Sequence, residues 1–140
     1  MSLNLFNQVE QKLKEIAENV SGVRQVSVAE PSLEEGFRSP RVFVWIREGE
    51  SAPSTISANK RRHLWRFEYV IDVVSARPET AYSQVKEIAW SLYDAIMSDR
   101  TLGGLVLRAD PASRFFRVEV PSEREYGHRW VMYVDVIVEE

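Results

Sequence analysis

The chain has 140 residues, of which 44% are apolar and 28% charged, and this composition is typical of one globular domain spanning residues 1–140. Because the sequence has no cysteine, thiol catalysis, thiolate metal sites and disulfides are excluded. The formal net charge of −3 gives no overall attraction to nucleic acid or to an anionic membrane. We expect no signal peptide and no membrane partner, since the sequence lacks a long apolar run.

The first predicted element is an amphipathic helix over residues 3–20, because apolar residues recur there at steps of three and four. Ser21-Gly22 ends it, since glycine adopts the left-handed conformation that follows many helices. A short strand is expected over residues 23–28.

The next predicted strand, residues 41–47, is apolar on both faces. Strict alternation separates its side chains into two sets, so both faces should be covered, by helices or by a neighbouring subunit. The two sets are Val42, Val44 and Ile46 on one face, and Phe43 and Trp45 on the other.

Residues 48–60 contain few large apolar groups and carry Gly49 and Pro53, which predicts a long hairpin arm. We expect this arm to contact a partner. Its candidate contact residues are Glu50, Ser54, Ile56, Lys60, Arg61 and Arg62. A long strand over residues 62–75 follows, with Trp65 and Phe67 on one face and Asp72 on the other.

A second helix is predicted to begin at Pro78 and to end near Asp99. Trp90 falls off its apolar stripe at the helical period. The stripe itself consists of Tyr82, Val85, Ile88, Ala89, Leu92, Tyr93 and Ile96. Two short strands, residues 105–109 and 115–120, are expected on either side of a turn at Asp110-Pro111, before a last strand over residues 129–138.

This order of elements predicts an α+β fold, in which two helices pack on one face of a mostly antiparallel sheet. Long strands joined by hairpin loops favour antiparallel pairing.

Catalytic and cofactor motifs are missing from the sequence, so we expect no enzyme, no cofactor and no metal. His63 and His128 stand alone, without the HExxH or HxH spacing of a metal site, and are expected at the surface or at a strand edge. The acidic pairs lie in predicted loops or at the terminus, where carboxylates stay solvated. A small-molecule or enzymatic site too dispersed to recognise remains one alternative.

A nucleic-acid-binding module is another alternative. Lys60, Arg61 and Arg62 could hold phosphates, and Trp65 and Phe67 could stack on bases. Two features oppose this interpretation: the aromatic residues alternate as a core face does, and Arg62 lies on the face opposite Trp65.

Several large aromatic residues fall outside the predicted core, and a small domain rarely exposes many of them. We therefore predict a protein–protein interface formed by Phe43, Trp45, Trp90 and Tyr133. The alternative is an error of one position in the assigned registers, which would move each aromatic residue into the core.

Three segments carry a resemblance to a known family: residues 92–96 (LYDAI), residues 102–106 (LGGLV) and residues 132–138 (MYVDVIV). Together with the amphipathic opening helix, the strand pair with a long arm and the strand at residues 67–74, the layout resembles the tail terminator (tail-completion) proteins of long-tailed bacteriophages and prophages. Related small neck and tail proteins share this layout and remain an alternative.

The resemblance implies a structural protein that forms a ring, usually a hexamer, at the end of the tail tube. Such a ring ends tube polymerisation and offers a joining surface to the head. The implied partners are further copies of the chain, the tail tube protein and the head–tail connector or stopper protein. DNA would pass through the ring without specific binding. The implied location is the host cytoplasm during assembly and then the virion tail.

Overall fold

The computed structural model describes residues 2–32, 37–53, 60–119 and 126–140, and for residues 2, 53 and 113–119 it describes the backbone only. Ser54 and Ile56, two of the expected arm contacts, lie outside the described residues. Two helices and five strands follow one another along the chain. They are α1 (Ser2–Glu18), β1 (Gln25–Val28), β2 (Arg41–Pro53), β3 (Arg61–Ser75), α2 (Pro78–Ser98), β4 (Arg108–Glu119) and β5 (Tyr126–Glu139).

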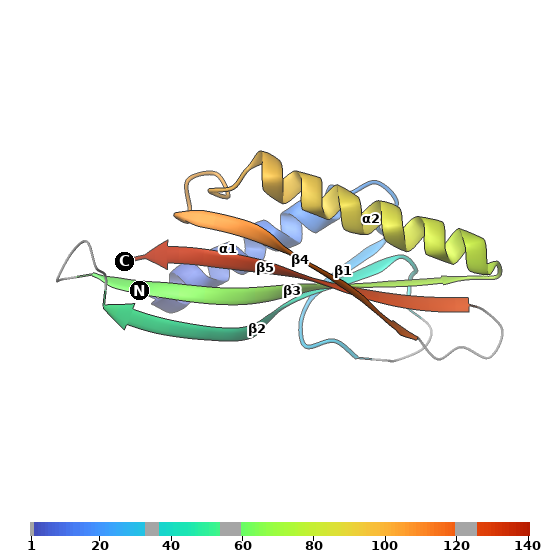
Figure 1. Ribbon diagram of the computed structural model, residues 1–140, viewed down its shortest axis with the longest axis horizontal. Helices are drawn as coiled ribbons and strands as arrows, with labels where there is room; N and C mark the ends of the chain where they lie inside the picture. Colours follow the sequence, from blue (N-terminus) through green and yellow to red (C-terminus); the bar gives the residue numbers. More distant parts are fainter. Residues whose placement is uncertain (1, 33–36, 54–59, 120–125) are drawn as a thin grey trace.

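The strands form one sheet in the order β1-β2-β3-β5-β4. Only β1 and β2 run parallel, and the other neighbouring pairs are antiparallel. Figure 1 shows β3 running the length of the molecule, with β2 and β5 as long strands on either side of it and α2 beside the sheet. Both helices contribute to the same core, so the predicted α+β fold with helices on one face of a mostly antiparallel sheet is confirmed.

The main core lies between the helices and the sheet, where the helical stripes meet alternate residues of the strands. Val42 and Val44 of β2 and Phe67 of β3 are almost completely buried there. Tyr69 is also buried, and its hydroxyl donates a hydrogen bond of 2.7 Å to the carbonyl oxygen of Leu13 in α1. This contact ties α1 to the central strand.

The predicted arm is shorter than expected, because β2 continues to Pro53 where the sequence indicated a loop from residue 48. A bulge between Ile46 and Glu48 shifts the register, after which pairing with β3 resumes. Gly49 lies inside this strand for a packing reason. A Cβ atom at Gly49 would lie 2.9 Å from Cδ1 of Trp65, closer than side-chain contacts allow.

The two short strands predicted after α2 are also incorrect. Residues 105–107 form turns and bends, and one strand, β4, runs from Arg108 to Glu119 with an irregularity between Ala112 and Phe116. Asp110-Pro111 therefore lies within a strand and makes no turn. Proline is tolerated there because β4 is the edge strand of the sheet and pairs only with β5.

Candidate interaction surfaces

The sheet face opposite the helices, called the open face below, carries a second apolar cluster. Phe43, Val70 and Val131 are buried in it, and Trp45 and Tyr133 pack against it partly buried. Three of the four predicted interface residues are thus brought together from β2 and β5. They lie outside the main core, as expected, although Phe43 is only 5% exposed and so is not a surface residue.

One end of this cluster is closed by a buried ionic network that the sequence did not reveal. Asp72 is fully buried, and its carboxylate accepts hydrogen bonds from Arg41 at 2.7 Å and from Arg129 at 2.6 Å. Both guanidinium groups also donate to the carbonyl oxygen of Ser32, which fixes the segment before β2 against the sheet. Arg41 additionally lies over the ring of Phe43, with the guanidinium carbon 4.5 Å from the ring centroid.

The other end of the open face is more exposed and is crossed by ion pairs. Arg66 and Asp135 form a two-pronged contact at 2.8 and 3.1 Å, which raises the pKa of Arg66 above its ordinary value. The indole nitrogen of Trp45 donates to Glu68 at 2.7 Å. A shallow groove of about 240 Å³ runs here. Its lining residues are Glu48, Gly49, Glu50, Leu64, Arg66 and Asp135.

The charged side chains that line this groove form ion pairs with one another. Arg66, Asp135 and Glu48 pair with one another and so do not converge on an empty centre. In the part of the chain that the structure describes, no three His, Cys, Asp or Glu side chains are grouped closely enough to hold a metal ion. The open face thus combines an apolar cluster with paired charges.

A second surface with exposed aromatic residues lies on α2. Trp90 is 48% exposed, which confirms that it lies off the core stripe. Tyr82 is also 48% exposed, so its predicted place in the buried stripe is wrong. We call Tyr82, Lys86, Trp90, Tyr93 and Met97 the α2 stripe, because at 100° per residue they fall within one narrow sector beside the buried one.

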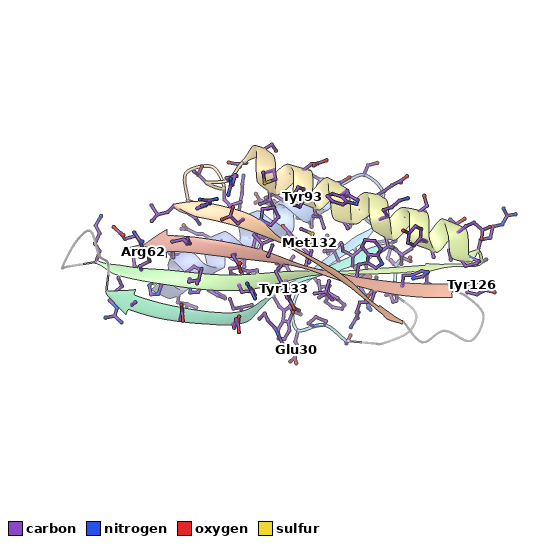
Figure 2. All side chains as sticks on the ribbon, in the orientation of Figure 1. Glu30, Arg62, Tyr93, Tyr126, Met132 and Tyr133 are labelled. Atoms are coloured by element: carbon purple, nitrogen blue, oxygen red, sulfur yellow. The ribbon has the colours of Figure 1, made fainter. Side chains whose placement is uncertain are left out.

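Two contacts within the α2 stripe are aromatic. The ring of Trp90 meets that of Tyr93 edge-on, with centroids 5.3 Å apart. The ammonium nitrogen of Lys86 lies 5.1 Å from the ring centroid of Tyr82. Figure 2 shows Tyr93 on α2 and Tyr133 on the sheet, so the α2 stripe and the aromatic cluster of the open face are two separate surfaces.

The basic cluster at the start of β3 is not a continuous positive patch. Arg62 pairs with Glu139 at 3.2 Å, and Arg61 exchanges backbone hydrogen bonds with Glu140. Lys60 and Arg61 are exposed, but Glu140 lies beside Arg61, and Glu139 lies beside Arg62. Because carboxylates would repel phosphates at this position, the arrangement does not favour the nucleic-acid alternative.

Both histidines were expected at the surface or at a strand edge, but each is only 8% exposed, and they lie on β3 and β5, which are inner strands of the sheet. His63 contacts Ser51 Oγ through Nδ1 at 2.5 Å and Glu140 Oε2 through Nε2 at 3.0 Å, while its ring stacks on Trp65. This row links β2, β3 and the last residue of the chain. We interpret it as a polar contact that holds Glu140, which follows β5, against β3.

No protein-family model matches the sequence, and no curated protein matches it. A chain in a solved structure, the virion of a native gene transfer agent particle, has a similar structure. The TM-score is 0.48 and the sequence identity is 13%, and the alignment covers 95% of this chain and 91% of that one. Among the helices described here, none is long and apolar enough to cross a membrane.

Proposed function

We propose that this protein is a structural subunit of a phage-like tail, a tail terminator that caps the tail tube as a closed ring. The observation that carries the proposal is the presence of two different aromatic surfaces on opposite layers of one small domain. Trp45 and Tyr133 lie on the open face, and Trp90 lies on α2. The resemblance of residues 92–96, 102–106 and 132–138 to tail terminators gives the proposal its specific form.

A closed ring needs two different contact surfaces on each subunit. Neighbouring subunits in a cyclic ring meet through two different patches, so each subunit must carry both. An open face that meets the α2 stripe of the next subunit would satisfy this requirement. Both patches contain tryptophan and tyrosine, which are enriched where interfaces are strongest.

The ring would act by steric contact and without chemical catalysis. On the open face, the carboxylates of Glu48, Glu68, Asp72 and Asp135 each pair with an arginine. The hairpin of β2 and β3 ends at Pro53 and Arg61, and this end would contact the tail tube or the head–tail connector. Docking of the ring would then stop tube growth and present a joining surface.

The test is to mix the protein with tail tube protein and to image the products by negative stain, with the mass measured by light scattering. We expect a ring with a central hole at one end of each tube, and tubes that stop growing when the protein is added. Tubes that continue to grow, with no protein at their ends and no ring at any concentration, would refute the proposal.

A matched pair of variants locates the contact. Tyr133→Arg changes the exposed part of the open face, and Trp90→Arg changes the α2 stripe. Each variant alone should fail to close a ring, because every junction needs both patches. Tyr126→Arg is the control, since Tyr126 is 54% exposed and belongs to neither patch. Figure 2 shows it at the right-hand end of the sheet, where β5 begins.

A further inference from the structure

The exposed face of α2 has a charge pattern that is complementary to itself. Positions four residues apart form one row along a helix, and Trp90 stands in the middle of such a row. Lys86 lies one step before Trp90 and Asp94 one step after it, each about 6 Å away along the helix axis. If a second copy of the helix runs in the opposite direction along this row, its Lys86 therefore takes the place of Asp94, and its Asp94 takes the place of Lys86.

The charged residues of this row are available for an external partner. Lys86 and Asp94 are both exposed. Within the described part of the chain, neither forms an ion pair, and the ammonium group of Lys86 lies over the ring of Tyr82. Trp90, 48% exposed, lies between them. A large aromatic residue flanked by opposite, unpaired charges is the composition of an interface centre with a polar rim.

We propose that two copies of this chain associate through α2, with the helices antiparallel and a twofold axis at Trp90. Lys86 of each copy then lies beside Asp94 of the other, so that one contact produces two ion pairs. The commonest class of helix packing crosses the axes at about −50°, and this angle aligns the four-residue rows of the two helices. Each Trp90 would enter the groove beside Tyr93 and Met97 of the other copy.

The charge pattern favours a second copy over an unrelated partner. In a twofold contact, the same patch meets itself, so each residue must suit its symmetry mate. The row Lys86, Trp90, Asp94 meets this requirement at every position: the charges pair with each other, and tryptophan meets tryptophan. A contact with a different protein would not require a pattern that is symmetric about Trp90.

This inference goes beyond the proposed function and rests on α2 alone. If both proposals hold, the twofold dimer covers the α2 stripe in the free protein, and the stripe becomes available for the ring contact only when the dimer separates. The dimer would then delay ring formation until a tail tube is present. The following experiment contains no tail tube protein, so its result is independent of the ring assay.

The test uses two charge reversals, Lys86→Glu and Asp94→Lys, with the molar mass measured by light scattering and sedimentation over a wide concentration range. The unmodified protein should be a dimer. Each single variant places like charges opposite each other at two positions and should dimerise about tenfold more weakly or worse. An equimolar mixture of the two variants should restore association as a heterodimer, because both pairs again have opposite charges. The double variant should restore it in one chain.

Glu18→Lys is the control, because it makes the same type of charge change on an exposed position of α1. It should leave the dimer unchanged, and circular dichroism should show every variant folded. A monomer at all concentrations, or a dimer that both single reversals leave intact, would overturn the proposal. Loss of the dimer in each variant without recovery in the mixture would also overturn it, since the twofold pairing predicts recovery.

Discussion

The two faces of the sheet use alternate residues of the same strands for different purposes. In β3, Phe67, Tyr69 and Ile71 point toward the helices and are almost completely buried among apolar side chains. Glu68, Val70 and Asp72 point the other way, into a smaller cluster with charged residues at both ends. One strand therefore contributes to a continuous hydrophobic core on one side and to a polar, partly exposed surface on the other.

This difference shows where the molecule can change without losing its fold. The helix side is stabilised by close packing, so a loss of volume there has no nearby compensation. The open face is stabilised by a few buried charges at one end, while the other end holds partly exposed pairs. We therefore expect the exposed end to tolerate substitution and the buried end to resist it.

The largest effect is expected for Phe67→Ala on the helix side. Phe67 is 1% exposed and packs against Phe6 and Trp65, so its removal leaves a cavity that costs about 4 kcal/mol. Chemical denaturation gives this free energy of unfolding. Phe43→Ala is the matched substitution on the open face and should cost less, because partly exposed Trp45 and Tyr133 can move into the space. If Phe43→Ala lowered the free energy of unfolding as much as Phe67→Ala or more, the expected difference between the two faces of the sheet would be contradicted.

The next largest effect is expected for Asp72→Asn, which leaves Arg41 and Arg129 without a buried counter-ion. Breaking a buried ion network by removing one charge costs about 3 kcal/mol. Asp135→Asn is the control, since Asp135 also binds an arginine, Arg66, on the same face, but the side chains are 28% and 37% exposed. It should cost less than about 1 kcal/mol. If both variants lost a similar free energy of unfolding, the difference in burial between the two ends of the open face would not explain their stability.

The main core could be predicted from the sequence because it depends on periodicity. The helical stripe of α1 and the alternation in β3 each follow from one segment, and both were confirmed. The place of Trp90 outside the core also follows from the helical period alone. The sequence pattern places Tyr82 wrongly because Tyr82 lies at the margin of the apolar stripe. A residue there is buried only if another element covers it, and the helical period does not show which elements lie nearby.

The open face could not be predicted to the same extent because it depends on pairing between strands. Asp72 was assigned to the correct face, but its two arginine partners come from β2 and β5, far away in the sequence. Their meeting requires the register of three strands. The continuation of β2 past residue 47 was missed for a related reason: Glu48 and Gly49 are poor strand formers, and their pairing with β3 overrides this preference.

A smaller effect, with a distinct pH dependence, is expected for Tyr69→Phe. The substitution removes the hydrogen bond to the carbonyl oxygen of Leu13 and should cost about 1 kcal/mol at neutral pH. Burial raises the pKa of Tyr69 well above its ordinary value, so the unfolded chain releases this proton before the folded one does. The stability that Tyr69 contributes is therefore present below about pH 10 and is lost as the pH rises above that value.

Tyr69→Phe cannot lose a proton at this position, so its stability should fall less steeply in alkaline solution. Denaturation of both proteins between about pH 7 and pH 11 would show the difference between them shrinking as the pH increases. A difference that stays constant over this range would mean that Tyr69 ionises equally in the folded and unfolded chains. That result would contradict the complete burial of its hydroxyl.

The smallest effect on folding is expected for Trp90→Ala, although tryptophan is the largest side chain on α2. Its ring is 48% exposed, so truncation should change the free energy of unfolding by about 0.5 kcal/mol or less when measured at a concentration where the chain is monomeric. Leu92→Ala is the comparison, because Leu92 lies two residues away in the same helix and is fully buried. It should cost about 3 kcal/mol. If Trp90→Ala destabilised the monomer as much as Leu92→Ala does, Trp90 would belong to the core, and an interface on α2 would lose its central residue.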